Sequence, residues 1–257
     1  AAADLNTIGI CGPVVFNVVQ GTYNEQITLG DIIGSSSVNT VTFQPDPSNT
    51  PPAILTFAAT GTANNFVFQF DENKNTTVQG LTLTAAGTTY GRAFVFSGNN
   101  EYINILNNNI NGPITGTSST NTALIFHNTA SANRANYVLV DGNMLTGGAY
   151  GIYTYGISTT DYEVGNRITN NTISDFYSYG IYHYYQDSAV IDNNTVTSLP
   201  VGNTSLYGIY NYYSDNSSVQ NNKIVLNGPS SIYGIYAYLN DATAAGPTIY
   251  ANNMISC

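Results

Sequence analysis

The motif Tyr-Gly-Ile-Tyr begins at Tyr150, Tyr179, Tyr207 and Tyr233, and it decides the fold. Successive copies are 29, 28 and 26 residues apart. Degenerate copies lie upstream as Asn-Phe-Val-Phe at 65–68, Ala-Phe-Val-Phe at 93–96 and Ala-Leu-Ile-Phe at 123–126. Self-similarity at a fixed period of about 20 to 50 residues is typical of solenoids and other repeat proteins. The motif therefore predicts a stack of equivalent units.

A second motif, Asn-Asn-x-aliphatic, lies between these copies. It occurs at 107–110, 170–173, 193–196, 221–224 and 252–255, with a weaker Gly-Asn-Met-Leu at 142–145. Each unit then holds short β-rich runs and no helical apolar period, which excludes βαβ units. Asn tolerates the left-handed backbone of a sharp corner, and stacked Asn amides can hydrogen-bond between coils.

These repeats predict an all-β fold, a right-handed parallel β-helix solenoid with a short N-terminal cap. Each strand would pair with its equivalent one coil later. A β-sandwich is the alternative, but its strands would not repeat their sequences in register.

We expect one domain over residues 1–257. Residues 1–12 would form the cap, with a helix at Ala1–Ile10, and 13–60 irregular first coils. Regular coils of about 28 residues would fill 61–257. Expected early strands are Val14–Val19, Ile27–Leu29, Val38–Gln44 and Ala53–Phe57. The sequence shows no C-terminal cap, and we expect the chain to be a fragment of a longer protein.

Composition excludes two classes of partner. Charged residues make up 8% of the chain, only five are basic, and the formal net charge is -10. Such a surface repels phosphate backbones and offers no basic patch to anionic lipid, so we expect no nucleic acid and no membrane insertion. Scarce Lys with abundant Asn, Thr, Ser, Gly and Tyr favours an extracellular or cell-surface location.

The N-terminal region resembles a known family. Gly-Pro-Val-Val-Phe-Asn-Val at 12–18 and Gly-Thr-Tyr-Asn-Glu-Gln-Ile at 21–27 are similar to the opening of pectin-lyase-like β-helix domains. More narrowly, they resemble those in large surface proteins exported by the type IX secretion system of Bacteroidetes. The resemblance implies a secreted parallel β-helix. Enzymes of this fold act on acidic polysaccharides, but the Asn-Thr-Asp, Gly-His-Gly and Arg-Ile-Lys motifs of polygalacturonases are missing here.

No catalytic residue is assigned. Arg167 and Lys223 are the two cations expected within about two coils of each other, too few for a lyase to grip a polyanion. His127 and His183 fall at equivalent positions two coils apart, and packing explains them better than catalysis. We therefore favour a non-catalytic surface module that binds glycan or protein, or that serves as a structural or adhesin element. The alternative is a polysaccharide lyase or glycoside hydrolase, because paired carboxylates could face one groove.

Aligned repeats place aromatic residues in two columns on one face. Val67, Val95, Ile125, Ile152, Ile181, Ile209 and Ile235 would point to the interior, because side chains alternate along a strand. The aromatic columns would point outward and form a platform for sugars or a protein. The alternative is that the tyrosines are buried. The first column is Phe68, Phe96, Phe126, Tyr153, Tyr182, Tyr210 and Tyr236; the second is Phe70, Tyr155, Tyr184, Tyr212 and Tyr238. The eight tyrosines in these columns are the predicted ligand-binding residues.

Asp187, Asp215 and Asp241 each lie eight residues after a Tyr-Gly-Ile-Tyr start. Carboxylates stacked at about 4.8 Å repel each other, and Ca²⁺ would relieve this with oxygen ligands. The competing interpretation is that each Asp caps a solvated turn.

Cys11 and Cys257 are the two cysteines of the chain. They lie near the two ends of the predicted solenoid, roughly 40 Å apart, whereas a disulfide needs Cα atoms within about 7 Å. We expect no bond between them within one molecule. Each is a free thiol, a partner for a cysteine outside this chain, or half of an end-to-end link between subunits.

Overall fold

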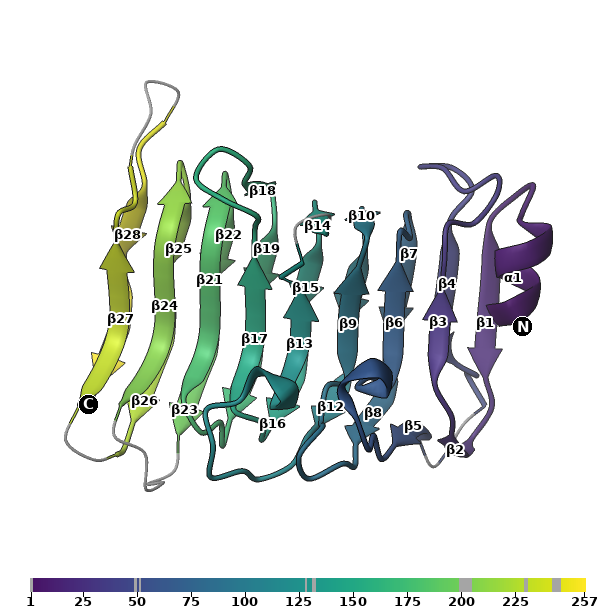
Figure 1. Ribbon diagram of the computed structural model, residues 1–257, viewed down its shortest axis with the longest axis horizontal. Helices are drawn as coiled ribbons and strands as arrows, with labels where there is room; N and C mark the ends of the chain where they lie inside the picture. The colour runs from purple at the N-terminus through teal and green to yellow at the C-terminus, as the bar shows by residue number, and fades with distance from the viewer. Residues whose placement is uncertain are drawn as a thin grey trace.

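The chain winds into a right-handed parallel β-helix, as expected from the repeats. The computed structural model describes residues 2–48, 50, 52–127, 129–130, 133–198, 205–228, 231–241 and 246–257. Its coils stack along one axis with the termini at opposite ends (Figure 1). Strands of three parallel sheets alternate along the chain, so each coil contributes one strand to each sheet.

The first sheet has the strands β1 (Val14–Val18), β4 (Val41–Pro45), β7 (Thr76–Gln79), β11 (Asn104–Leu106), β15 (Leu139–Asp141), β19 (Arg167–Thr169), β22 (Val190–Asp192), β25 (Ser218–Gln220) and β28 (Ile249–Ala251). The second sheet has β2 (Gly21–Asn24), β5 (Ala53–Phe57), β8 (Thr82–Ala85), β12 (Asn109–Asn111), β16 (Met144–Thr146), β20 (Thr172–Ser174), β23 (Thr195–Ser198), β26 (Lys223–Leu226) and β29 (Met254–Ser256). The third sheet has β3 (Ile27–Leu29), β6 (Phe68–Asp71), β9 (Phe94–Ser97), β13 (Ala123–His127), β17 (Tyr150–Tyr155), β21 (Tyr179–Asp187), β24 (Leu206–Asp215) and β27 (Ile232–Tyr238).

Short elements complete the coils. They are α1 (Ala2–Ile8), the 3₁₀ turns η1 (Thr62–Asn64) and η2 (Thr120–Thr122), the pair β10 (Asn99–Glu101) and β14 (Arg134–Asn136), and β18 (Glu163–Val164) beside β21. Helix α1 packs at the N-terminal end of the solenoid, as the expected cap (Figure 1). Complete three-strand coils already begin at β1, β2 and β3, within the segment that we expected to be irregular.

The Asn-Asn pairs form the corner between the first and second sheets. Their first members, Asn107, Asn170, Asn193, Asn221 and Asn252, have φ between 53° and 57°, and Gly142 takes the same place at 67°. Their second members form a buried ladder in which the backbone N–H of Asn143 donates to Oδ1 of Asn171 at 2.9 Å, and that of Asn171 to Oδ1 of Asn194 at 3.0 Å. The predicted amide stacking is confirmed.

The strand register confirms one part of the predicted alignment and corrects another. Tyr153, Tyr182, Tyr210 and Tyr236 pair in parallel on successive coils, as predicted. Upstream, Phe126 pairs with Val95, and Val95 with Gln69. The predicted column was therefore wrong by one residue in β6 and β9, and a slip of one residue moves every side chain to the other side of the sheet.

The consequence is that the phenylalanines are in the core. Phe68, Phe70, Phe94 and Phe96 are at most 1% exposed. Phe68 and Phe94 continue into the interior column of Ile125, Ile152, Ile181 and Ile209. Val95, predicted to point inward, instead packs with the external cluster of Phe126 and Tyr153.

Cys11 and Cys257 are both free and exposed, which confirms that they do not bond to each other within one molecule. The proposed end-to-end link between subunits stays a prediction for non-reducing electrophoresis. Across the described ranges, no helix has the length and apolar character to span a membrane.

Candidate functional site: the tyrosine face

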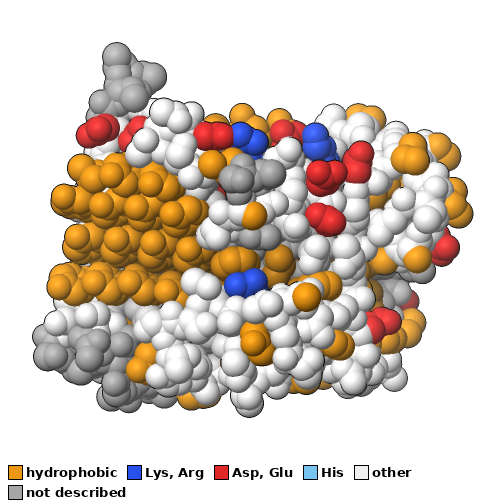
Figure 2. All heavy atoms as spheres, viewed as in Figure 1, with side chains coloured by type: hydrophobic (Ala, Val, Ile, Leu, Met, Phe, Trp, Pro, Cys, Tyr) orange, Lys and Arg blue, Asp and Glu red, His pale blue; other side chains and the backbone are white. Residues whose placement is uncertain are grey.

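Twelve tyrosines form a regular external surface on β17, β21, β24 and β27, which we name the tyrosine face. Figure 2 shows it as parallel rows of apolar side chains over the C-terminal coils. Ladder 1 is Tyr150, Tyr179, Tyr207 and Tyr233; ladder 2 is Tyr153, Tyr182, Tyr210 and Tyr236; ladder 3 is Tyr155, Tyr184, Tyr212 and Tyr238. Within each ladder, ring centroids of neighbouring coils are 4.7 to 5.0 Å apart.

The glycine of each motif explains how two tyrosines three residues apart reach the same face. At Gly180 a Cβ atom would lie 2.4 Å from Cγ1 of Val196, a core residue of the second sheet, so this position faces the interior. The next residue, Ile181, is also fully buried. Two successive inward positions break the strict alternation and leave Tyr179 and Tyr182 both outside. Sequence reasoning missed ladder 1 because it assumed unbroken alternation, although the glycine repeats in all four motifs.

The rings pack in two orientations. Rings of ladder 1 stand at 84° to 89° to those of ladder 2, whereas ladders 2 and 3 are nearly parallel over most of the face. Offset stacking and edge-to-face contacts are the preferred arrangements of aromatic pairs. Stacking covers ring faces with the neighbouring ring, so inside the array chiefly ring edges and hydroxyl groups remain at the surface.

Exposure differs along the face. Tyr233 and Tyr238 are 40% and 49% exposed, most of the others are half-buried, and Tyr150 and Tyr153 are 8% and 7% exposed. Among the predicted binding residues, Tyr153 is therefore the one that solvent reaches least. Burial raises the pKa of Tyr210 to about 12 and that of Tyr182 further, so these two central tyrosines stay neutral at physiological pH.

A loop and a cation close the N-terminal end of the face. The Tyr150 hydroxyl donates to the Ser118 carbonyl at 3.4 Å, and the Arg92 guanidinium carbon lies 3.5 Å from the centre of the Phe126 ring. Burial lowers the pKa of Arg92 to about 10, which leaves it charged at neutral pH. A cation over an aromatic ring is attracted by the ring quadrupole. The open part of the face therefore begins at β21.

An acidic row borders ladder 3. Asp187 pairs in register with Asp215, and the Asp241 backbone N–H donates to Oδ1 of Asp215 at 3.1 Å. Burial, with help from the Asp241 and Asp187 charges, raises the pKa of Asp215. The carboxylate of Asp187 accepts a hydrogen bond from Asn216 Nδ2 at 2.7 Å. Among the described residues, no group of three or more His, Cys, Asp or Glu could hold a metal ion, so the calcium site stays a prediction.

The two histidines lie inside the coil. His127 is 1% exposed and its Nδ1 is 2.9 Å from Oε2 of Glu163, which also accepts from Gln186 Nε2 at 2.8 Å. His183, also 1% exposed, shares a hydrogen bond of 2.7 Å with Thr154 Oγ1. Burial, with the nearby His127, lowers the pKa of His183 to about 3. These groups form a polar core layer out of reach of a substrate.

Arg167 and Lys223 do not form the pair of cations that a lyase would need. Arg167 begins β19 in the first sheet, and Lys223 begins β26 in the second. Both side chains are exposed, and they point outward from different sides of the solenoid. We had expected the two residues to be close because they lie about two coils apart. The number of coils between two residues does not say which sheet each belongs to.

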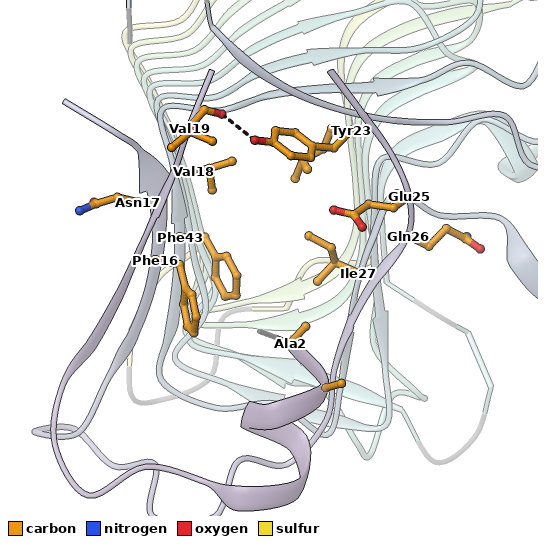
Figure 3. Close-up of a pocket in the computed structure, with 12 residues that line it drawn as sticks. Ala2, Phe16, Asn17, Val18, Val19, Tyr23, Glu25, Gln26, Ile27 and Phe43 are labelled. Atoms are coloured by element: carbon orange, nitrogen blue, oxygen red, sulfur yellow. Dashed lines mark hydrogen bonds between the residues drawn. The ribbon is translucent and has the colours of Figure 1, made fainter. Parts of the chain in front are cut away.

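A cavity of about 450 Å³ opens at the N-terminal end of the coil interior. Figure 3 shows Phe16, Phe43 and Ile27 pointing into it, with Ala2 of α1 below and the Glu25 carboxylate on one wall. The Tyr23 hydroxyl donates to the Val19 carbonyl at 3.0 Å across its upper edge. Its walls are the first coils of the core, which α1 covers in part.

A family model and two solved structures are similar to this chain. Residues 150–256 match the family model described as the right handed beta helix region. The structure is similar to a lacto-N-biosidase of family GH136 from Eubacterium ramulus, with a TM-score of 0.64 and 13% identity. That match covers 98% of this chain and 54% of the other, so this chain spans about half the length of that enzyme. At such identity the likeness concerns the fold alone.

A second similar structure is the Streptococcus pneumoniae surface protein and adhesin PfbA. The TM-score is 0.41 and the identity 10%, with 95% of this chain and 92% of that chain covered. The search of curated proteins gave no significant match. The matched family model and the order of strands in the three sheets agree, and the chain is a right-handed parallel β-helix.

Proposed function

We propose that this chain is a non-catalytic extracellular binding module whose tyrosine face contacts a flat protein surface. The observation that carries the proposal is the continuous array of three tyrosine ladders, half-buried to exposed from β21 to β27. Tyr combines a large apolar ring with a polar hydroxyl group, and it is enriched in protein interfaces. An apolar array of this extent on one side of a protein marks an interaction surface.

Ring orientation favours protein over glycan as the partner of this face. Aromatic rings carry negative charge on the face and positive charge on the edge, and a stacked sugar presents its C–H groups to the ring face. Between β21 and β24, the facing rings of the three ladders lie 4.7 to 4.9 Å apart and cover each other's faces. Edges and hydroxyl groups remain, and these suit the side chains and backbone of a protein.

The acidic row adds a condition on the partner. Acidic side chains border the rows of tyrosines in Figure 2. Asp187 and Asp215 end β21 and β24, two of the strands that carry ladder 3, and Asp241 follows the end of β27 by three residues. A partner with basic groups along one edge of its apolar contact would complement this border. Binding should then weaken as salt is added.

The test compares two surfaces of the same coils. Purified protein is applied to immobilised extracellular proteins and, in parallel, to a glycan array. The double variant Tyr184→Ser, Tyr212→Ser should bind the protein ligand about tenfold or more weakly, because interface tyrosines are frequent hot spots. The double variant Thr195→Ala, Thr197→Ala changes two residues of the second sheet. It is the matched control and should bind as the unmodified chain does. Binding that appears on glycans alone, or that the tyrosine variant retains, contradicts the proposal.

A glycoside hydrolase is the second candidate, and one observation favours it. Asp187 and Asp215 are neighbours in register, and the pKa of Asp215 is raised by burial and by like charge. Glycoside hydrolysis uses two neighbouring carboxyl groups, of which the general acid has a raised pKa. Hydrolysis of nitrophenyl glycosides that is lost in Asp215→Asn would establish this activity; absence of turnover across a panel would reject it.

A further inference from the structure

A second pair of tyrosines lies on a different side of the solenoid. Tyr102 and Tyr137 are 51% and 45% exposed, and their rings stack at 5.0 Å with an interplanar angle of 6°. Both occupy the corner that precedes the first sheet, two residues before Asn104 and Leu139, which pair between β11 and β15. This pair is separate from the tyrosine face of the third sheet.

The backbone at this corner is left-handed in every coil that flanks the pair. φ is 54° at Asn75, 57° at Tyr102, 54° at Tyr137 and 70° at Gly165, and these residues are equivalent by register. Asn and Gly adopt this conformation readily, whereas for Tyr it is uncommon and costs energy. Two tyrosines are thus placed where the backbone favours other residues.

The residues on either side determine which ring faces are open. On one side, a Cβ atom at Gly165 would lie 2.6 Å from the Tyr137 ring, so Tyr137 rests on the glycine. Tyr137 covers one face of Tyr102. On the other side of Tyr102 the equivalent residue is Asn75, whose short side chain turns to Ser35 with an Nδ2–Oγ distance of 3.3 Å. The ladder of rings therefore stops at Tyr102.

The structure has a hollow at the position where the next ring would stand. A cavity of about 280 Å³ is lined by Ser37, Thr40, Asn75, Thr77, Tyr102 and Asn104. Apart from the Tyr102 ring, its lining side chains are hydroxyl and amide groups, and none carries a charge. Asn104 Nδ2 donates to Thr77 Oγ1 at 3.1 Å, which leaves the amide oxygen of Asn104 as an acceptor on the wall.

We infer that this hollow, together with the open face of Tyr102, is a binding site for one neutral pyranose ring. The ring would continue the stack from Tyr137 through Tyr102, with its C–H face on the tyrosine and its hydroxyl groups toward Thr77, Asn104 and Asn75. An uncharged lining suits a neutral sugar rather than a uronic acid, since no cation faces the cavity. The volume is at the lower limit of small-molecule sites, which fits a single ring.

The experiment measures binding of three neutral methyl glycosides, of glucose, galactose and N-acetylglucosamine, by saturation-transfer NMR on the intact chain. We expect millimolar affinity for at least one, as is reasonable for one ring on an open site. Tyr102→Ala removes the platform and should weaken binding by about tenfold or more. Tyr238→Ala, an equally exposed tyrosine on the tyrosine face, is the matched control and should bind as the unmodified chain does.

A second variant, which fills the hollow with a side chain, tests the inference even if Tyr102→Ala is unstable. Asn75→Tyr would extend the ladder by one ring into the hollow, at a left-handed position where this corner already holds two tyrosines. It should fold normally, judged by circular dichroism, and should abolish sugar binding. No transfer to any of the three glycosides, or full binding by folded Asn75→Tyr, would overturn the inference. So would transfer to adenosine alone, since the site would then take a flat aromatic ligand.

Discussion

The two halves of the third sheet place aromatic rings on opposite sides of the same wall. In β6 and β9, Phe68, Phe70, Phe94 and Phe96 fill the interior. In β17, β21 and β24 the rings are external, and Ile152, Ile181 and Ile209 occupy the interior with Thr154, His183 and Asn211. A phenolic hydroxyl group needs a partner when it is buried, whereas Phe has no such requirement. The aromatic residues of the third sheet are therefore phenylalanines where they point into the coil, and tyrosines where the rings of β17, β21 and β24 point out of it.

The largest effect expected from this difference is on stability. Phe94 is fully buried, with its centroid 5.8 Å from Phe68 and 6.0 Å from Phe70. Phe94→Ala should lower the free energy of unfolding by about 4 kcal/mol, the usual cost of a large cavity. Tyr182→Ala, in the external ladder, should cost about 1 kcal/mol of lost ring contact. Urea denaturation of both variants measures the difference between their free energies of unfolding. Equal decreases in the two variants would mean that the tyrosines too are core residues.

The polar interior behind the tyrosines should make stability depend on pH. The pKa of His183 is about 3 in the folded chain and 6.5 in the reference state. The unfolded chain therefore binds more protons between these values, and stability is full above pH 6.5 and falls as pH decreases toward 3. The loss from pH 7 to pH 4 should be about 3 kcal/mol.

The control for this pH effect uses the neighbouring coil. Asn211 takes the place equivalent to His183, which makes His183→Asn a natural replacement. Its free energy of unfolding should vary less with pH over the same range. Thr154, His127 and Glu163 surround this layer, so the variant must retain the native circular dichroism spectrum for the comparison to hold. An unaltered pH profile would show that other groups control acid unfolding.

The motif glycine should have an intermediate effect. Gly180→Ala brings a methyl group within 2.4 Å of Val196 Cγ1 and 2.7 Å of the Gly208 carbonyl oxygen. Overpacking of this kind should cost about 2 kcal/mol. Gly116→Ala, where no atom lies within 4 Å, should be nearly neutral. Thermal unfolding distinguishes the two variants. An unchanged stability of Gly180→Ala would mean that the coil can make room for a methyl group between Gly180 and Val196.

A small gain is expected at the acidic border of the tyrosine face. The pKa of Asp215 is raised by burial and by the Asp241 and Asp187 charges, so its ionisation opposes folding as pH rises above the unfolded value. Asp215→Asn should therefore raise the free energy of unfolding at pH 7 and leave it unchanged at low pH, where the carboxyl group is protonated. A loss at pH 7 would indicate that the hydrogen bonds outweigh the charge.

The calcium hypothesis carries the smallest expected effect. Asp187 and Asp215 already accept hydrogen bonds from Asn216 and the Asp241 amide, so neither carboxylate depends on a cation for a partner. We expect chelation to leave the melting temperature unchanged. A ligand that binds only the folded chain must raise stability, so a clear decrease in chelator would restore the calcium site.

The sequence by itself determined the solenoid, its period and its corners. Exact or degenerate copies of Tyr-Gly-Ile-Tyr recur about every 28 residues from residue 65, and Asn-Asn-x-aliphatic lies between most of them. A repeat with no helical period leaves few folds that can bury it. The Asn ladder and the pairing of Tyr153, Tyr182 and Tyr210 were predictable for this reason. Tyr102 and Tyr137 also carried a signal, since each lies five residues before a corner residue, Asn107 or Gly142.

Only the tertiary structure decided which side each aromatic ring takes and which ring faces stay open. By residue type, Phe-Val-Phe at 94–96 aligns with Tyr-Gly-Ile-Tyr so that Val95 matches Ile152 and Phe96 matches Tyr153. In the structure Val95 instead pairs with Phe126, one residue away from that alignment. Ladder 1 reaches the surface because Gly180 packs against Val196 of another sheet. The open face of Tyr102 exists because Asn75 is short and Gly165 admits Tyr137. Each depends on atoms one coil or one sheet away, which local sequence does not specify.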